Sequence, residues 1–349
     1  MRFSILFTLC LAALSFAASP KVVGYYPYWV QYSQFFPGDV RYEFVTHIHY
    51  VGATPVDDGS LVLADETDAA NFELLAKNAQ DNKVALLLVV GGADAEATLK
   101  TIAQDENLLS AFTSAVQEWV GKYQLAGIEL DWQNLTEEDK SAYEAMVQAL
   151  VSAKGEKLLS LTTYPLASSN AYDASVLSKA DYITVSVVEQ MTEEVAVLKP
   201  NLSGKDIENA LNTLSSAGVD KSKMVPVVSL LAKTFLGAKG LGTPHQGAGS
   251  GNEGYLTYRE LMDNAFKGTD YQVTFDEATE SEVAVSSTES IVFMGIPSVK
   301  AVANRVKSGG MSGVAIYDLS QDHQEPIVSL LVTVGQILRP EVNYTKKKK

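Results

Sequence analysis

Two acidic residues and one amide occupy every second position in a short stretch near the middle of the chain. Glu129, Asp131 and Gln133 alternate with apolar residues over 128–133. Because residues two apart in a β-strand share one face, the alternation predicts a polar row with about 7 Å between neighbours. Two carboxyl groups this close should raise the pKa of at least one of them. Such a pair suits proton transfer, whereas a side-chain amide has no proton to give and only forms hydrogen bonds.

The segments around this stretch predict that both faces of the strand are buried. An amphipathic helical pattern ends at 119–123, and another helix is expected to begin after Thr136. A strand between two helices normally belongs to a parallel sheet that is covered on both sides. Acidic side chains in such a place need a cavity, a partner or a chemical task.

The wider pattern alternates short apolar runs with helical segments. We predict the eight strands at 21–26, 46–51, 83–90, 127–133, 158–163, 180–188, 224–231 and 312–317. Helices are expected at 68–81, 99–123 with a break near Asp105, 137–154, 203–217, 297–307 and 326–338. Eight such units favour an α/β fold of the closed (β/α)8 type, the TIM barrel.

One segment departs from the alternation. Residues 237–254 are rich in glycine, a helix is expected at 255–266, and three short strands follow before 295. We therefore predict that 232–290 forms a small α+β insertion between the seventh strand and the next helix. The barrel domain is expected to span 18–349.

Composition limits the classes of partner. The formal net charge is −15, which disfavours nucleic acid and anionic membrane surfaces and is compatible with a neutral ligand such as a glycan. No dinucleotide-binding or P-loop motif follows a predicted strand, so we expect no cofactor. His47 and His49 share a strand face and form a possible metal pair, but we expect histidines held by hydrogen bonds and no metal site. We expect a monomer.

The N-terminus has the features of a secretory signal peptide. Arg2 precedes a mainly apolar run over 3–14, and small residues at Ser15 and Ala17 predict cleavage after Ala17. The apolar run is shorter than the roughly 20 residues that cross a bilayer. We therefore expect a signal peptide over 1–17, no membrane span, and a protein that is secreted or held in the periplasm or cell envelope.

The central stretch also carries a family resemblance. Residues 126–133, AGIELDWQ, resemble the D-G-x-D-x-D-x-E signature on the fourth strand of family-18 glycoside hydrolases, the chitinase family. Gly127 and Asp131 match the signature, whereas Ala126, Glu129 and Gln133 replace its first Asp, second Asp and final Glu. In the family that Glu is the general acid, the substrate's own N-acetyl oxygen attacks the anomeric carbon, and the last Asp orients the acetamido group. The resemblance implies that Gln133 holds a glycosidic oxygen without protonating it.

Other segments resemble the family's sugar subsites. The first predicted strand has the G-Y-x-x-x-W opening, which implies that Tyr25 and Trp29 line sugar subsites. Val-Val-Gly-Gly resembles the family's S-x-G-G, which implies that Gly91 and Gly92 border the substrate. Tyr317 stands where the family has the Trp floor under the reacting sugar, and a tyrosine can still stack on a sugar face.

The sixth predicted strand lacks further family residues. Val188 stands where a tyrosine hydrogen-bonds the reacting acetamido group, and Glu189 replaces the following Asp. Glu189 enters near the rim and is therefore a candidate substitute acid. Glu129 is a poorer one, because four residues of strand place it roughly 14 Å below Gln133.

Three hypotheses follow. The first is a secreted, catalytically impaired chitinase-like protein that binds chitin or another glycan containing N-acetylglucosamine. The second is an active chitinase or endo-β-N-acetylglucosaminidase that uses Glu189 or Glu129 as its acid. The third is a non-catalytic envelope or structural barrel without a sugar site.

Overall fold

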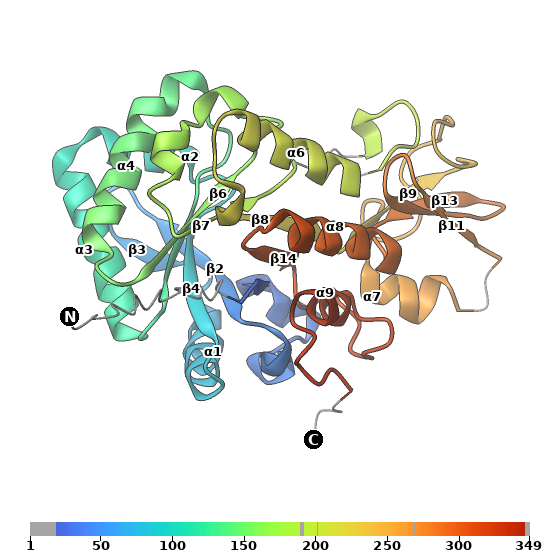
Figure 1. Ribbon diagram of the computed structural model, residues 1–349, viewed down its shortest axis with the longest axis horizontal. Helices are drawn as coiled ribbons and strands as arrows, with labels where there is room; N and C mark the ends of the chain where they lie inside the picture. The colour runs from blue at the N-terminus through green and yellow to red at the C-terminus, as the bar shows by residue number, and fades with distance from the viewer. Residues whose placement is uncertain (1–18, 189–191, 201, 268–269, 346–349) are drawn as a thin grey trace, which may run out of the picture.

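The computed structural model describes residues 19–188, 192–200, 202–267 and 270–345, and its main element is a closed parallel barrel (Figure 1). The eight barrel strands are β1 (Lys21–Pro27), β2 (His47–Pro55), β4 (Ala85–Gly91), β5 (Gly127–Asp131), β6 (Leu158–Thr163), β7 (Tyr182–Val185), β8 (Met224–Ser229) and β14 (Gly313–Tyr317). Because β1 pairs with both β14 and β2, the sheet closes on itself. The predicted (β/α)8 barrel is confirmed. A short strand, β3 (Leu61–Leu63), pairs antiparallel with β2.

Helices follow most of the barrel strands and cover the outside of the sheet (Figure 1). They are α1 (Ala69–Asp81), α2 (Glu96–Gln104), α3 (Glu106–Lys122), α4 (Lys140–Ala153), α5 (Ala174–Leu177), α6 (Gly204–Ser216), α8 (Ile296–Gly309) and α9 (Leu330–Leu338). The predicted break near Asp105 is present, because the Asp105 carboxylate accepts hydrogen bonds from the first backbone N–H groups of α3. Ser203 caps α6 in the same way through the N–H of Asp206.

Among the predicted elements that are shorter in the structure, two differ most. The helix expected over 326–338 begins only at Leu330. Its start is set by polar side chains, since the Asp322 carboxylate accepts the N–H groups of Leu330 and Leu331, and Ser329 caps the helix. The strand expected over 180–188 is confined to β7, which ends at Val185.

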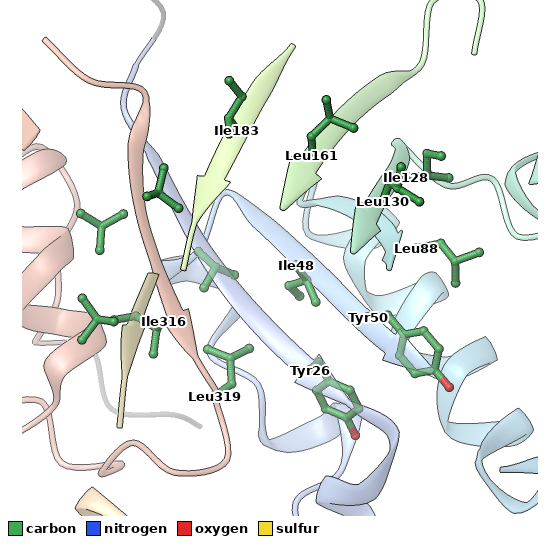
Figure 2. Close-up of a cluster of buried hydrophobic side chains, with 14 of the residues drawn as sticks. Tyr26, Ile48, Tyr50, Leu88, Ile128, Leu130, Leu161, Ile183, Ile316 and Leu319 are labelled. Atoms are coloured by element: carbon green, nitrogen blue, oxygen red, sulfur yellow. The ribbon is translucent and has the colours of Figure 1, made fainter. Parts of the chain in front are cut away.

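The alternation in β5 separates two environments. Ile128 and Leu130 point outward into the large apolar cluster between the sheet and its helices, which Figure 2 shows in part. Glu129 and Asp131 have the opposite orientation and are nevertheless buried, with exposed fractions of 0% and 9%. Both faces of β5 are therefore buried, as predicted for a strand between two helices, and the acids face the barrel interior.

The segment between β8 and α8 in the sequence forms a second sheet, which lies on the right of Figure 1. It is antiparallel in the order β10-β9-β13-β12-β11, with β9 (Leu231–Leu236), β10 (Tyr255–Thr257), β11 (Gln272–Asp276), β12 (Ser281–Val285) and β13 (Glu289–Phe293). β9 was not predicted. The prediction of a helix over 255–266 is also wrong at its start. The first three residues form β10, and the short helix α7 (Tyr258–Glu260) follows.

A salt bridge and a backbone hydrogen bond join the second sheet to the barrel helices. The guanidinium of Arg305 in α8 donates to both carboxylate oxygens of Glu280, at 2.7 and 2.8 Å. The backbone N–H of Gly204, the first residue of α6, donates to the Glu280 carbonyl at 3.1 Å. The turn between β11 and β12 is thereby held against both helices.

Two predictions concern a signal peptide and the absence of a membrane span. The expected signal peptide over 1–17 lies outside the described residues. Within the described ranges, no helix combines the length and apolar character that a membrane crossing requires.

Gly127 tests the close packing of β5 against β6. A Cβ at Gly127 would lie 2.0 Å from the backbone oxygen of Leu158, its registered partner. We expect Gly127→Ala to lower the free energy of unfolding by about 1–3 kcal/mol, measured by urea denaturation. Gly121→Ala is the control: it lies in exposed α3 with no atom within 4 Å of the added Cβ, and should raise stability by roughly 0.5–1 kcal/mol. Equal stabilities for the two variants would contradict this account.

Candidate active site

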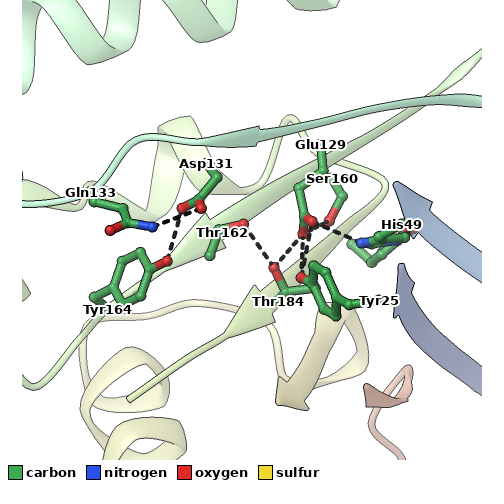
Figure 3. A network of polar contacts seen from close by, with 10 residues as sticks. Tyr25, His49, Glu129, Asp131, Gln133, Ser160, Thr162, Tyr164 and Thr184 are labelled. Atoms are coloured by element: carbon green, nitrogen blue, oxygen red, sulfur yellow. Dashed lines mark hydrogen bonds and ion pairs between the residues drawn. The ribbon is translucent and has the colours of Figure 1, made fainter. Parts of the chain in front are cut away.

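Glu129 lies at the centre of the barrel, where side chains from four other strands hydrogen-bond to it (Figure 3). The Tyr25 hydroxyl donates at 2.9 Å, and Nδ1 of His49 lies 2.8 Å from Oε2. The hydroxyls of Ser160 and Thr184 donate to Oε1 at 3.2 and 2.5 Å. These groups come from β1, β2, β6 and β7, so one carboxyl group connects five of the eight strands.

The surroundings of Glu129 keep it ionised. Burial alone would raise its pKa, but the charge of His49 and the hydrogen bonds from His49, Thr184 and Tyr25 lower the pKa below its usual value. The second ring nitrogen of His49 lies 2.6 Å from the Tyr182 hydroxyl, which extends the network. A fully buried carboxylate with these partners neither reaches a substrate nor has a proton to give.

Asp131 lies one step further toward the mouth of the barrel and has different neighbours. Its Oδ2 accepts a hydrogen bond from Nε2 of Gln133 at 2.9 Å, and its Oδ1 accepts one from the Tyr164 hydroxyl at 2.9 Å. Figure 3 shows these three side chains as a group beside the Glu129 network. β5 ends at Asp131, yet Gln133 lies on the same side as Asp131, as the alternation predicts.

The pKa of Asp131 is raised to about 6. Burial is the largest cause, the negative charge of Glu129 adds to it, and the hydrogen bonds from Gln133 and Tyr164 partly oppose it. The sequence predicted that one of the two acids would have a raised pKa. The main cause is burial rather than the neighbouring acid. Asp131 can therefore change its charge within the mildly acidic range.

Gly91 and Gly92 end β4 beside the backbone of Asp131. Both have positive φ, at 109° and 93°, and a Cβ at Gly91 would lie 2.2 Å from the Asp131 carbonyl oxygen. The N–H of Gly92 donates to that same oxygen at 2.8 Å. The two glycines thus hold the end of β5 through the backbone, which only residues without a side chain permit.

The aromatic residues inferred to line sugar subsites lie in different environments. Tyr25 is 4% exposed, its hydroxyl is bonded to Glu129, and its ring centroid lies 5.0 Å from that of Tyr317. Tyr317 is half-buried at the end of β14. Trp29 is 40% exposed in the short helix after β1, with its ring 5.2 Å from that of Tyr28. Glu189 lies outside the described residues.

A cavity of about 500 Å³ opens beyond the ends of β6 and β7, against the turn between β11 and β12. Leu166 and Val188, which line it, are 46% and 53% exposed. Ala278 and Thr279 contribute the wall from the second sheet. The cavity combines these apolar residues with the charged side chains of Lys199, Lys205 and Asp206.

Sequence reasoning missed several members of the two networks. Thr184 and Tyr182 share the inward face of β7, and Ser160 shares its strand face with Tyr164, one residue past the predicted end of that strand. Continuing the period of two along each strand would have identified these residues. His49 was assigned only a hydrogen-bonding role, and its partners could not be named. Among the described residues, no group of three or more His, Cys, Asp or Glu side chains is placed to hold a metal ion.

Comparison with known proteins identifies the scaffold. The model of the glycosyl hydrolases family 18 matches residues 21–322. This chain belongs to that family. "Probable chitinase 10" of Drosophila melanogaster is 22% identical over 94% of this chain, which spans 16% of the Drosophila protein. The class V chitinase CHIT5 of Lotus japonicus is 22% identical, with 84% of this chain and 82% of that protein covered.

A solved chitinase structure has the same fold. A class V chitinase from Nicotiana tobaccum, solved as a Glu-to-Gln mutant in complex with NAG4, superposes with a TM-score of 0.84 at 16% identity. The match covers 92% of this chain and 99% of that one. At this identity the similarity establishes the fold alone, and the chemistry has to be argued from the side chains of this chain.

The raised pKa of Asp131 predicts a pH-dependent gain in stability on its removal. The folded state penalises ionised Asp131, so the wild type loses stability as the pH rises from the ordinary value of 3.8 through about 6. The asparagine of Asp131→Asn cannot ionise. At pH 7.5 we therefore expect this variant to have a free energy of unfolding about 1–3 kcal/mol higher than that of the wild type. The difference should shrink toward pH 4. Urea denaturation at both pH values measures it. Exposed Asp94→Asn is the control, and a gain that is the same at both pH values would contradict the prediction.

Proposed function

We propose that this family-18 chain binds a glycan containing N-acetylglucosamine, such as a chitin oligosaccharide, at the mouth of the barrel and does not cleave it. The pairing of Gln133 with Asp131 carries the proposal. The Gln133 amide lies at the outer end of the inward row, where the family signature has its acid, and one of its N–H groups is bonded to the Asp131 carboxylate. The remaining N–H and the carbonyl of Gln133 can hold sugar oxygens and hydroxyls.

Several features of the mouth support glycan binding. Active sites of (β/α)8 barrels lie at the C-terminal ends of the strands, and Asp131, Tyr164 and Tyr317 all lie at such ends. Tyr317 supplies a half-buried aromatic side chain that can stack on a sugar ring. The Asp131 carboxylate can accept hydrogen bonds from sugar groups. The tobacco relative was solved with NAG4 as a Glu-to-Gln mutant, so a glutamine-for-glutamate change is compatible with sugar binding in that protein.

The loss of cleavage follows from proton chemistry. Protonation of the leaving oxygen by a positioned acid contributes roughly 10²–10⁴-fold to a rate, and an amide cannot supply that proton. Glu129 is fully buried and held as a carboxylate, so it does not substitute. Val188, at the position of the family's acetamido-binding tyrosine, has no polar group. An active glycosidase would require another acid, such as Glu189 or the protonated form of Asp131. A barrel without a sugar site would require that Asp131 and Tyr317 contact no ligand.

The cellular location forms part of the same proposal. The apolar run over 3–14 and the small residues before position 18 support export through a signal peptide cleaved after Ala17. An exported protein would meet extracellular or cell-wall glycan directly.

Calorimetry with chitotetraose tests binding and, with product analysis, cleavage. We expect the wild type to release binding heat and to leave the tetrasaccharide intact. Tyr317→Ala should weaken binding by about tenfold, because it removes roughly 1–2 kcal/mol of apolar contact. Leu74→Ala is the control, since Leu74 is 44% exposed on α1, one of the helices outside the barrel. Absence of heat would favour the barrel without a sugar site, and turnover lost in Glu189→Gln would favour the active glycosidase.

Gln133→Glu tests how much of the family's chemistry is missing. The new carboxyl would lie close to Asp131, and two acids about 3 Å apart share one proton. We expect it to restore little hydrolysis of chitotetraose, because Val188 and Ala126 still lack the polar groups of the family signature. Product release by chromatography measures the rate, with Gln133→Ala as the control. Hydrolysis at the ordinary rate of family-18 enzymes would show that position 133 alone accounts for the loss.

A further inference from the structure

The second sheet, on the right of Figure 1, ends in a strand that no other element covers. β11 is the last strand in the order β10-β9-β13-β12-β11, and among the strands that the structure describes it pairs with β12 alone. Residues 272–275 are all exposed, and the apolar side chains of Val273 and Phe275 are 49% and 38% accessible. An edge strand of this kind can pair with a strand from another molecule.

Hydrogen bonds within the sheet show which way the backbone of β12 points. The N–H of Ser286, the residue after β12, donates to the carbonyl of Glu289 in β13 at 2.9 Å, so the backbone groups of Ser286 face β13. Successive residues of a strand point their N–H and carbonyl groups to opposite sides. The backbone groups of Val285 and Val283 therefore face the other way, toward β11.

The same alternation identifies the backbone groups that β11 presents to solvent. The two inward-facing residues of β12 pair with Gln272 and Thr274, so the N–H and carbonyl groups of these two residues are used within the sheet. Those of Val273 and Phe275 point outward, and no backbone hydrogen bond joins either residue to another part of the described chain. The edge thus offers hydrogen-bond donors and acceptors beside two apolar side chains.

This edge is complementary to itself. When two copies of β11 lie antiparallel with Thr274 opposite Thr274, Val273 of each copy lies opposite Phe275 of the other. Both residues point outward, so each such pair can exchange both of its N–H···O=C hydrogen bonds. The apolar side chains of the two copies then lie together on one face, where aromatic and β-branched residues stabilise a strand pair.

Charges near the edge favour this register over its neighbours. The register can change only by two residues, because a change by one would place an outward-facing residue opposite an inward-facing one. In one direction that change places Asp276 opposite Asp270, and like charges directly opposite each other are destabilising. In the other direction Val273 lies opposite Glu277. In the central register Asp276 lies opposite Gln272, whose amide can donate a hydrogen bond to the carboxylate.

We propose that β11 pairs with β11 of a second copy of this chain and joins the two five-stranded sheets across a two-fold axis. One short strand pair falls below the roughly 1,200 Å² that stable interfaces bury, so the dimer is weak, with a Kd on the order of 100 µM. The net charge of −15 on each copy opposes association, and salt screens it. The dimer departs from the monomer expected from the sequence and is independent of glycan binding at the barrel mouth.

Sedimentation velocity over roughly 5–500 µM protein in about 0.5 M NaCl tests the association, because charge repulsion is then short-ranged. We expect the wild type to change from monomer to dimer over this range. Val273→Lys places an ammonium group opposite Phe275 and should weaken the dimer by about tenfold or more. Leu74→Lys is the matched control, since Leu74 is 44% exposed on α1 and the charge change is the same. Thermal melting shows that both variants are folded.

Amide hydrogen exchange of the wild type, followed by NMR, locates the contact without a substitution. The N–H groups of Val273 and Phe275 should exchange quickly in dilute protein and be protected in concentrated protein. The N–H of Thr274 should be protected at both concentrations, because it faces β12.

Each alternative outcome overturns the proposal. A chain that stays monomeric at every concentration does so, whether or not another strand can bind the edge. So does a dimer that Val273→Lys leaves intact, or one in which the N–H groups of Val273 and Phe275 stay unprotected, because the contact then lies elsewhere. Equal weakening by Val273→Lys and Leu74→Lys would report the added charge rather than the edge.

Discussion

The carboxylate of Glu129 and the imidazole of His49, 2.8 Å apart and fully buried, impose the constraint on which the barrel interior depends. A charge removed from water is costly unless opposite charge and hydrogen bonds surround it. Here Tyr25, Ser160 and Thr184 supply the remaining hydrogen bonds, so β1, β2, β5, β6 and β7 must present their polar residues at one height. Packing of the outward apolar side chains stabilises the same register from the other face.

That constraint also shapes the chemistry of the mouth. Glu129 stays charged below Asp131, and its charge together with burial raises the pKa of Asp131 to about 6. Gln133 and Tyr164 occupy one oxygen each of the Asp131 carboxyl group. The site therefore combines a carboxyl group of variable charge with an amide and a phenol, which together offer several hydrogen-bond donors and acceptors at the barrel mouth.

The fold of this chain and the family signature at its barrel mouth depend on different residues. The barrel depends on buried contacts such as those of Glu129 and the outward faces of the strands. Gln133 and Val188 lie at the rim and contribute little to those contacts, so their replacement leaves the scaffold intact. The residues at the mouth can therefore vary without loss of the barrel.

Local pattern alone was enough to place the eight barrel strands, the helix break near Asp105, the helix that starts near Ser203, and the shared face of Asp131 and Gln133. Strand period and helix starts depend on neighbours in sequence. It failed for β9, whose place in the second sheet depends on pairing with the distant β13. It also could not identify His49 and Tyr164 as the partners of Glu129 and Asp131. Those contacts join residues 80 and 33 positions apart, and only closure of the barrel brings them within hydrogen-bond distance.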